Sequence, residues 1–317
     1  MSNIGRGSKL SQNIIVIGGP TASGKSALAI DLAKLYNGVI VNADASQVYQ
    51  HIPVISAAPG AEDQKIVEHR LYGYLDESTK GNVCSWLNLA VDCVHKIWQS
   101  GQTPVFVGGT GMYIDNLING VTPIPETPQE IRKQAANELK DYGLEHIYKK
   151  LCTIDEASAT MLNKNDKTRV MRAYEIWLST GKTISFWYQQ PMVKKLPEAT
   201  FFNIAILPPK NILDDRCQIR FKKMLSDGAI EEVKYLLSRN LPSSLPAMSA
   251  KGVPELAEFL KGKTSMDQAF EQAVLHTKQY AKRQLTWFRN KFKADIILRE
   301  CYEGQQAFIN CVKKQYK

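Results

Sequence analysis

The octapeptide Gly19-Pro20-Thr21-Ala22-Ser23-Gly24-Lys25-Ser26 matches the pattern G-x-x-x-x-G-K-[ST] of a phosphate-binding loop. An apolar, β-branched run precedes it at residues 14–17, and leucines with helical spacing follow it over residues 26–36. A glycine-rich loop between a strand and a helix turns backbone N–H groups around an anion, and the positive end of the helix adds attraction. Lys25 then supplies a charge to the phosphates and Ser26 a hydroxyl to Mg²⁺. The pattern does not specify which di- or triphosphate is bound.

The segments beyond this loop alternate between strand and helix. Buried strands are predicted at residues 39–41 and 104–107, and between them an amphipathic helix is predicted at residues 84–99. Gly101 provides the stop signal for that helix. Such alternation predicts an α/β fold with a parallel sheet and right-handed crossovers.

A different pattern begins after a proline-rich stretch at residues 123–128. Helical periodicity continues from there without a convincing strand until a strand pattern resumes at residues 201–207. We therefore expect a helical insertion at residues 126–197. It would divide the α/β core into residues 1–125 and residues 198–317.

The composition excludes several classes of protein. The 317 residues carry a net charge of +9, with 44% hydrophobic and 22% charged residues, which is ordinary for a globular chain. No apolar run approaches the roughly 20 residues of a membrane helix, and the first twelve residues lack the apolar segment of a secretory signal. Six scattered cysteines form no C-x-x-C motif. We expect a cytoplasmic protein with reduced thiols, and its positive charge favours a polyanionic partner.

Two further candidate site features follow predicted strands. Asp44 comes directly after the strand at residues 39–41, at the edge of the sheet where ligands bind in open α/β folds. Its carboxylate could hold Mg²⁺ or act as a base, or it could cap a helix. The third strand runs into the segment Gly108-Gly109-Thr110-Gly111. These glycines suit either close approach of a ligand or a tight turn that needs their backbone freedom.

Basic residues form three groups that could contact phosphates. Arg216 and Arg220 are four residues apart on a predicted helix, and Arg169 and Arg172 form a similar pair in the insertion. Residues 276–293 carry six Lys and Arg side chains and no acid, interleaved with aromatic residues. On a helix, their basic ridge would lie beside an apolar face. Each group could equally be a solvated surface.

Together, these motifs resemble the tRNA dimethylallyltransferase family, also called tRNA isopentenyltransferases, in its bacterial form. The matching segments are collinear and cover most of the chain. They are GGPTASGKSALA (18–29), VNADASQVY (41–49), FVGGTGMYIDNLING (106–120), NDKTRVMRAYEIWLSTGKTIS (165–185), RCQIRFKKMLSDGAIEEV (216–233) and QYAKRQLTWFRN (279–290).

The resemblance implies a nucleoside-kinase-like P-loop core with a helical insertion domain that contacts tRNA. It implies transfer of a dimethylallyl group from dimethylallyl diphosphate to N6 of the adenosine immediately 3′ of the anticodon (adenosine 37), with release of diphosphate. In that family the loop holds the diphosphate of the donor and does not hold ATP for hydrolysis. The resemblance also implies Mg²⁺ as the cofactor and favours a monomer.

The resemblance further implies roles for single residues. Asp44 corresponds to the general base, and Thr110 to a threonine beside the target adenine. The diphosphate would be bound by residues 19–26 with Arg216 and Arg220, and the metal by Ser26. The implied tRNA contacts are Asp44, Ala45, Ser46, Gln47, Thr110, Arg132, Thr168, Arg169, Val170, Met171, Arg172, Lys278 and Lys282.

The chain also departs from the family pattern. Ala45 stands where the family usually has serine, Lys278 replaces a more usual arginine, and residues 248–254 lack an arginine and a Gly-Tyr pair. Three other functions fit part of the sequence: a small-molecule kinase, a transferase acting on free adenylate, and an RNA-binding P-loop protein without catalysis. The kinase would consume ATP. The free-adenylate enzyme would not need the basic helix or the insertion, and the RNA-binding protein would not need Asp44.

Overall fold

The computed structural model describes residues 12–316, which form two compact units. One unit runs up to Ile118 and resumes at Leu196, and the other is Asn119–Lys195. Residues 1–11 and 317 belong to the outer ends of the expected core segments and lie outside the described residues. The first twelve residues, in which no secretory signal was expected, therefore lie almost entirely outside the described residues. Across the described chain, no helix has the length and apolar character needed to cross a membrane.

The first unit is built on a six-stranded sheet within residues 12–316, and every pair of neighbouring strands is parallel. The order β3-β2-β4-β1-β5-β6 confirms the predicted α/β class, and the central strands are almost fully buried. The two-residue strand β3 was not predicted, because it is too short to show periodicity. The strands are β1 (Asn13–Gly18), β2 (Gly38–Asn42), β3 (His69–Arg70), β4 (Thr103–Gly108), β5 (Thr200–Ile206) and β6 (Ile296–Leu298).

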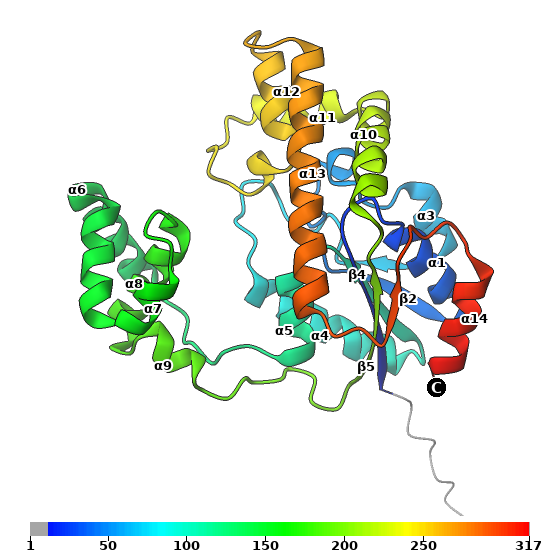
Figure 1. Ribbon diagram of the computed structural model, residues 1–317, viewed down its shortest axis with the longest axis horizontal. Helices are drawn as coiled ribbons and strands as arrows, with labels where there is room; N and C mark the ends of the chain where they lie inside the picture. The colour runs from blue at the N-terminus through cyan, green and yellow to red at the C-terminus, as the bar shows by residue number, and fades with distance from the viewer. Residues whose placement is uncertain (1–11, 317) are drawn as a thin grey trace, which may run out of the picture. The chain divides into compact units, whose positions relative to one another are not determined.

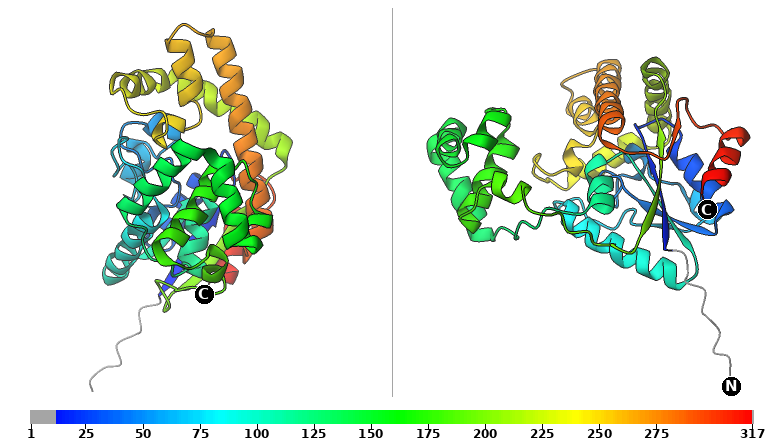
Figure 2. Two further views of the ribbon diagram at one scale, coloured as in Figure 1. Left: turned by 90° about the vertical axis from the view of Figure 1, so that its left-hand side faces the viewer. Right: turned by 60° about the horizontal axis from the view of Figure 1, so that its bottom comes forward.

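Helices cover both faces of this sheet (Figures 1 and 2). On one face, α1 and α14 pack against alternate strand residues such as Ile15, Ile40 and Val105. On the other face, Trp86 of α4 packs edge-on against Phe106. The helices of this unit are α1 (Lys25–Leu35), α2 (Pro53–Ser56), α3 (Ala61–Ile66), α4 (Val83–Gln99), α5 (Gly111–Asn119), α10 (Lys210–Ser226), α11 (Ala229–Ser238), α12 (Val253–Leu260), α13 (Met266–Lys291) and α14 (Gln306–Gln315).

The long helix α13 packs against α10 and α12 (Figure 1). It begins at a capping box, in which Ser265 and Gln268 satisfy each other's backbone N–H groups. Its predicted apolar face is buried through Ala281, Leu285 and Phe288. The neighbouring side exposes basic residues, including Lys282 and Arg289, so the prediction of a basic ridge beside a buried face is confirmed.

The second unit is a small helical domain with its own core. Its helices pack around buried side chains such as Ile147, Val170 and Tyr174. Gly143, with a φ of 81° and a ψ of 170°, breaks α6 into two straight parts. An antiparallel bridge between Val121 and Val193 joins the segments that lead into and out of the unit. Its helices are α6 (Gln129–Ile154), α7 (Glu156–Met161), α8 (Lys167–Thr180) and α9 (Ile184–Tyr188).

Candidate active site

Three loops meet at the carboxyl edge of the sheet. Gly18 of β1 pairs with Gly108 of β4, and Asn42 of β2 pairs with Val107, so the three strands end at nearly the same level. The phosphate-binding loop, the segment around Asp44 and the segment around Thr110 follow these strands directly. The parallel sheet therefore brings together residues that are far apart in the sequence, at the edge where α/β folds bind ligands.

The phosphate-binding loop is shaped to surround an anion. Gly24 has a φ of 93°, and a Cβ atom there would collide with the backbone oxygen of Tyr302. The hydroxyl of Ser23 is fully buried and has no hydrogen-bond partner among the described residues. The Lys25 ammonium donates to the Pro20 carbonyl at 2.6 Å. Burial lowers the pKa of Lys25 to about 8, an effect that the nearby Asp44 charge partly opposes.

Two arginines of α10 reach this loop in different ways. Arg220 donates to the Thr21 hydroxyl and lines the cavity described below. Its burial lowers the pKa of the guanidinium, so a bound anion would relieve an unfavourable desolvation. Arg216 instead donates from Nε to the Ala22 carbonyl at 2.9 Å and pairs with Glu303. Arg220 is thus placed to touch a ligand, whereas Arg216 supports the outer side of the loop.

The Asp44 carboxylate is held by short, local hydrogen bonds. One oxygen accepts from the backbone N–H of Ser46 at 3.0 Å and from the Ser46 hydroxyl at 2.7 Å. The other accepts from the N–H of Gly109 at 3.3 Å. Residues 45–50 form turns in the described structure, and no helix begins there. The interpretation of Asp44 as a helix cap is therefore wrong, and one of its carboxylate oxygens contacts the loop that follows β4.

The backbone of Asp44 is fixed by Asn42, which is fully buried. The Asn42 amide oxygen accepts from the Asp44 N–H at 2.8 Å, and its nitrogen donates to the carbonyls of Asp44 and Leu71, both at 3.0 Å. The Asn42 amide thus makes hydrogen bonds to the backbone on both sides of Asp44, which holds Asp44 in one position.

Thr110 and its glycines pack tightly against the Asp44 segment. The Thr110 hydroxyl accepts from the Ala45 N–H at 2.9 Å, which leaves its own proton available for donation. A Cβ atom at Gly108 would collide with Ala43, and one at Gly109 would collide with Gln284. Neither glycine is among those with a positive φ. Close approach of neighbouring groups, and not turn geometry, therefore explains this pair.

These residues surround a cavity of about 440 Å³. The phosphate-binding loop, Arg220 and Asp44 form its polar part, and Ile55, Phe221 and Met224 contribute apolar walls. The phenol of Tyr280 on α13 also lines it and hydrogen-bonds with Thr110. Burial, reinforced by the Asp44 charge, raises the pKa of this phenol, which therefore stays protonated at neutral pH. The cavity can hold an anionic group beside a small apolar group.

The oxygen groups in this cavity fit Mg²⁺. Ser26, in the first turn of α1, lines the cavity together with Asp44. Mg²⁺ typically binds through one or two protein oxygens, substrate phosphates and water, so this set is sufficient in the presence of a diphosphate.

The sequence did not reveal several residues that hold the site together. They include Asn42 and Gln284, both buried polar side chains, and Glu232 of α11. Glu232 accepts from the N–H groups of Val54 and Ile55 at 2.7 and 2.9 Å and so fixes α2, which forms part of the cavity wall. Asn42 directly follows the strand predicted at residues 39–41, and this position weakly indicates a role at the edge of the sheet. The partners of the other two are remote in the sequence, and no local pattern marked them.

The comparisons agree with this geometry. The IPP transferase family model matches residues 47–291. The chain is 42% identical over 278 residues to the tRNA dimethylallyltransferase of Zymomonas mobilis, which covers 88% of each protein. It is 36% identical over 306 residues to that of Rickettsia massiliae, covering 96% of this chain and 84% of the relative.

The chain belongs to the IPP transferase family. Solved structures agree with this assignment. A eukaryotic dimethylallyltransferase acting on tRNA is similar with a TM-score of 0.83 and 26% identity, over 96% of this chain and 77% of the other. The tRNA isopentenylpyrophosphate transferase of Bacillus halodurans is similar with a TM-score of 0.67 and 27% identity, over 96% and 95% of the two chains.

In this member of the IPP transferase family, the predicted tRNA-contacting residues of the helical unit differ in exposure. Val170 and Met171 are buried in its core, so their side chains are unavailable to a partner. Thr168, Arg169 and Arg132 are exposed. The partly buried Arg172 donates to the Thr127 hydroxyl at 2.8 Å. In the first unit, Lys282 is exposed and Lys278 partly buried.

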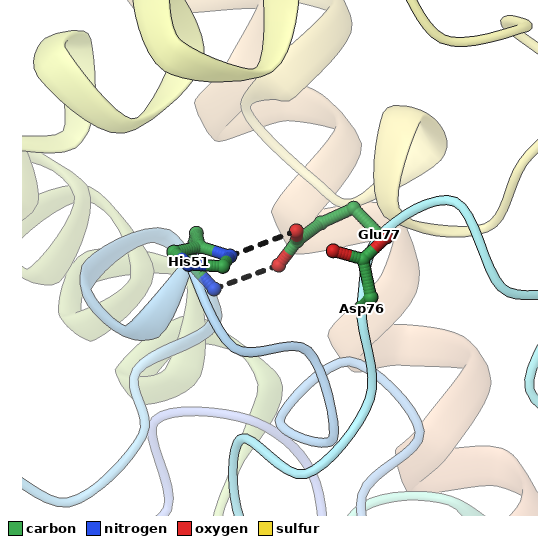
Figure 3. A group of neighbouring side chains, drawn as sticks. All are labelled: His51, Asp76 and Glu77. Carbon is green, nitrogen blue, oxygen red and sulfur yellow. Dashed lines mark hydrogen bonds and ion pairs between the residues drawn. The ribbon is translucent and has the colours of Figure 1, made fainter. Parts of the chain in front are cut away.

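One more cluster of ionisable groups lies outside the cavity. His51, Asp76 and Glu77 come together in a way that could suggest a metal site (Figure 3). However, Arg239 of α11 donates to Asp76 at 2.7 Å and to Glu77 at 3.2 Å, and His51 lies 3.0 Å from Glu77. The guanidinium is already paired with both carboxylates. We interpret the group as an ion-pair network that attaches the loop before α2 to α11.

Proposed function

We propose that this chain transfers the dimethylallyl group of dimethylallyl diphosphate to N6 of adenosine 37, immediately 3′ of the anticodon in tRNA. The observation that supports this most directly is the convergence of two partly buried cations, Lys25 and Arg220, with the Asp44 carboxylate in one cavity. The cations suit a leaving diphosphate, and the carboxylate suits an attacking amine. The names of the relatives support the same reaction.

The proposed step forms a bond between N6 and the first carbon of the dimethylallyl group and breaks the bond from that carbon to the diphosphate oxygen. Asp44 takes the proton that N6 loses. The loop N–H groups, Lys25 and Arg220 stabilise the negative charge that develops on the diphosphate. The Thr110 hydroxyl, held by the Ala45 N–H and the Tyr280 phenol, orients the adenine beside Asp44.

Mg²⁺ is proposed as the cofactor, held by Ser26 together with diphosphate oxygens. When bound, it would supply additional positive charge to the leaving group. The residues of the chain carry out the positioning and the proton transfer.

The proposed tRNA contacts combine the Asp44–Gln47 loop and Thr110 with Lys278 and Lys282. In the helical unit, the accessible candidates are Arg132, Thr168, Arg169 and Arg172. The target adenosine must leave the anticodon stack, because its N6 is otherwise out of reach of a carboxylate that lines a cavity. We further propose that the protein acts as a monomer in the cytoplasm, where its tRNA substrate is found.

The decisive experiment incubates the protein with labelled dimethylallyl diphosphate and unmodified tRNA, followed by nucleoside analysis. We expect label in N6-dimethylallyladenosine and one diphosphate released per transfer. A tRNA with guanosine in place of the target adenosine is the matched control and should remain unlabelled. Parallel reactions with ATP and with free AMP test the kinase and free-adenylate functions. Consumption of ATP without label on RNA would reject the proposal.

A further inference from the structure

Gln284 of α13 is a buried amide that contacts two of the three site loops. Its side chain is 5% exposed. Its oxygen accepts from the backbone N–H of Thr21 in the phosphate-binding loop at 2.8 Å, and its nitrogen donates to the carbonyl of Gly109 at 2.9 Å. These partners lie 263 and 175 residues away in the sequence. A buried amide must satisfy its donors and acceptor, and here it does so by joining separate loops.

The link continues to the proposed base. The N–H of the same Gly109 donates to the Asp44 carboxylate at 3.3 Å. A continuous chain of hydrogen bonds therefore runs from Thr21 through Gln284 and Gly109 to Asp44. Its two ends lie in the loop that would bind the leaving diphosphate and at the group that would take the proton.

The packing leaves little freedom around this link. A Cβ atom at Gly109 would collide with the Gln284 amide nitrogen, and one at Gly18 would collide with Phe288. Helix α13 therefore lies directly on the ends of β1 and β4. Tyr280, one turn before Gln284, hydrogen-bonds with both Thr110 and Gln284. One face of α13 thus contacts the phosphate-binding loop and the Thr110 loop, and Gly109 extends the link to Asp44.

We propose that Gln284 is a positioning residue that sets the separation between the phosphate cradle and Asp44. This inference rests on the proposed function. Transfer requires the attacking nitrogen and the donor carbon to lie about 3–3.5 Å apart and aligned, and a displacement of about 1 Å can lower the rate roughly 100-fold. Gln284 touches neither reactant in this role. It acts through the two loops that do.

The first test is Gln284→Met, which keeps the length of the side chain but removes its hydrogen bonds to Thr21, Gly109 and Tyr280. We expect kcat to fall roughly 10- to 100-fold, with KM for dimethylallyl diphosphate and for tRNA changed less than about threefold. The matched control is Val274→Ala, a buried residue of the same helix that does not line the cavity. It should lower the melting temperature while leaving kcat within about twofold of the unsubstituted enzyme.

The second test uses the fact that the Gln284 amide accepts a hydrogen bond from Thr21 and donates one to Gly109. In Gln284→Glu, an ionised carboxylate can accept from Thr21 but cannot donate to the Gly109 carbonyl, whereas a protonated carboxyl can do both. Burial raises the pKa of such a carboxyl toward neutrality. The ratio of this variant's kcat to that of the unsubstituted enzyme should therefore rise at least about threefold from pH 8 to pH 6. This measurement still tests the positioning role if Gln284→Met fails to fold.

The outcomes separate the inference from the proposed function. If the unsubstituted enzyme does not label tRNA, both fail. If it labels tRNA and Gln284→Met retains kcat within about twofold, or loses no more than Val274→Ala, only the positioning role is overturned. A ratio for Gln284→Glu that is constant with pH would equally contradict the donated hydrogen bond.

Discussion

The edge of the sheet and the helical unit Asn119–Lys195 present polar side chains in opposite ways. At the edge of the sheet, Asn42, Ser23 and Gln284 are buried, and most of their polar atoms bind backbone groups. In the helical unit, candidate contact residues such as Arg132 and Arg169 are exposed, and Arg169 makes only a 3.5 Å surface pair with Asp166. The buried set is held by its hydrogen bonds, whereas the exposed set is in contact with water.

Because of this difference, we expect the two regions to contribute to different steps, one to the chemical reaction and the other to tRNA binding. Buried, oriented groups act in a low dielectric and cannot be replaced by water, so they determine the rate of a chemical step. Exposed cations contribute a salt-dependent attraction that is spread over many phosphates. Substitutions at the sheet edge should therefore change catalysis steeply. Substitutions in the exposed set should change tRNA affinity gently and should not affect the donor.

The largest effect is expected for Asp44→Ala. Removal of the proposed base should lower kcat by about 10³-fold or more while dimethylallyl diphosphate binds almost as before. Single-turnover transfer and isothermal titration measure the two quantities. Asp92→Ala, which removes an exposed carboxylate of α4, is the matched control and should change neither kcat nor donor binding. Full turnover by Asp44→Ala would remove Asp44 from the mechanism and with it the distinction between the two regions.

The second effect concerns Lys25 and pH. Its lowered pKa of about 8 means that the free protein loses this positive charge as the pH rises through 8. Because the charged form binds the diphosphate, the donor Kd should increase roughly tenfold between pH 7 and pH 9. Lys25→Met should weaken binding at pH 7 by roughly 10- to 100-fold and abolish the pH dependence.

Lys34→Met, on the exposed end of the same helix, provides the control for this measurement. It should leave both the affinity and its pH profile unchanged. An affinity of the unsubstituted protein that is the same at pH 7 and pH 9 would mean that Lys25 does not carry the charge that holds the donor.

Local sequence patterns were sufficient for the parts of the fold whose partners are near in the chain. The strand, loop and helix around Lys25 follow from one motif, and the parallel sheet follows from the alternation of elements. The helix predicted at residues 276–293 was recognised by its charge. It actually begins at Met266, and the capping box of Ser265 and Gln268 could have marked this start.

The parts that could not be predicted depend on contacts across the fold. Leu89, in the amphipathic helix predicted at residues 84–99, is 40% exposed, because helical spacing predicts an apolar face but not how much of that face the sheet covers. Gln284 looks like an ordinary polar residue in a basic helix until α13 is placed on β1 and β4. The sequence also could not separate Val170 from its exposed neighbour Arg169, because the family motif includes both.

The smallest effects are expected for single exposed cations. Arg169→Ala and Lys282→Ala should each weaken tRNA binding only a few-fold near physiological salt. Each should reduce the slope of log affinity against log salt concentration by about one, since one phosphate contact is lost. Lys65→Ala removes an exposed lysine of α3 that is paired with Glu62, and it should leave the slope unchanged.

Dimethylallyl diphosphate affinity, measured without tRNA in the same variants, gives the most direct contrast between the regions. It should be unaffected by Arg169→Ala and Lys282→Ala, because neither residue lines the cavity. If tRNA affinity instead showed no salt dependence, the exposed cations could not be the surface that attracts the RNA. Recognition would then have to come from the buried groups at the sheet edge, and the same residues would govern both affinity and rate.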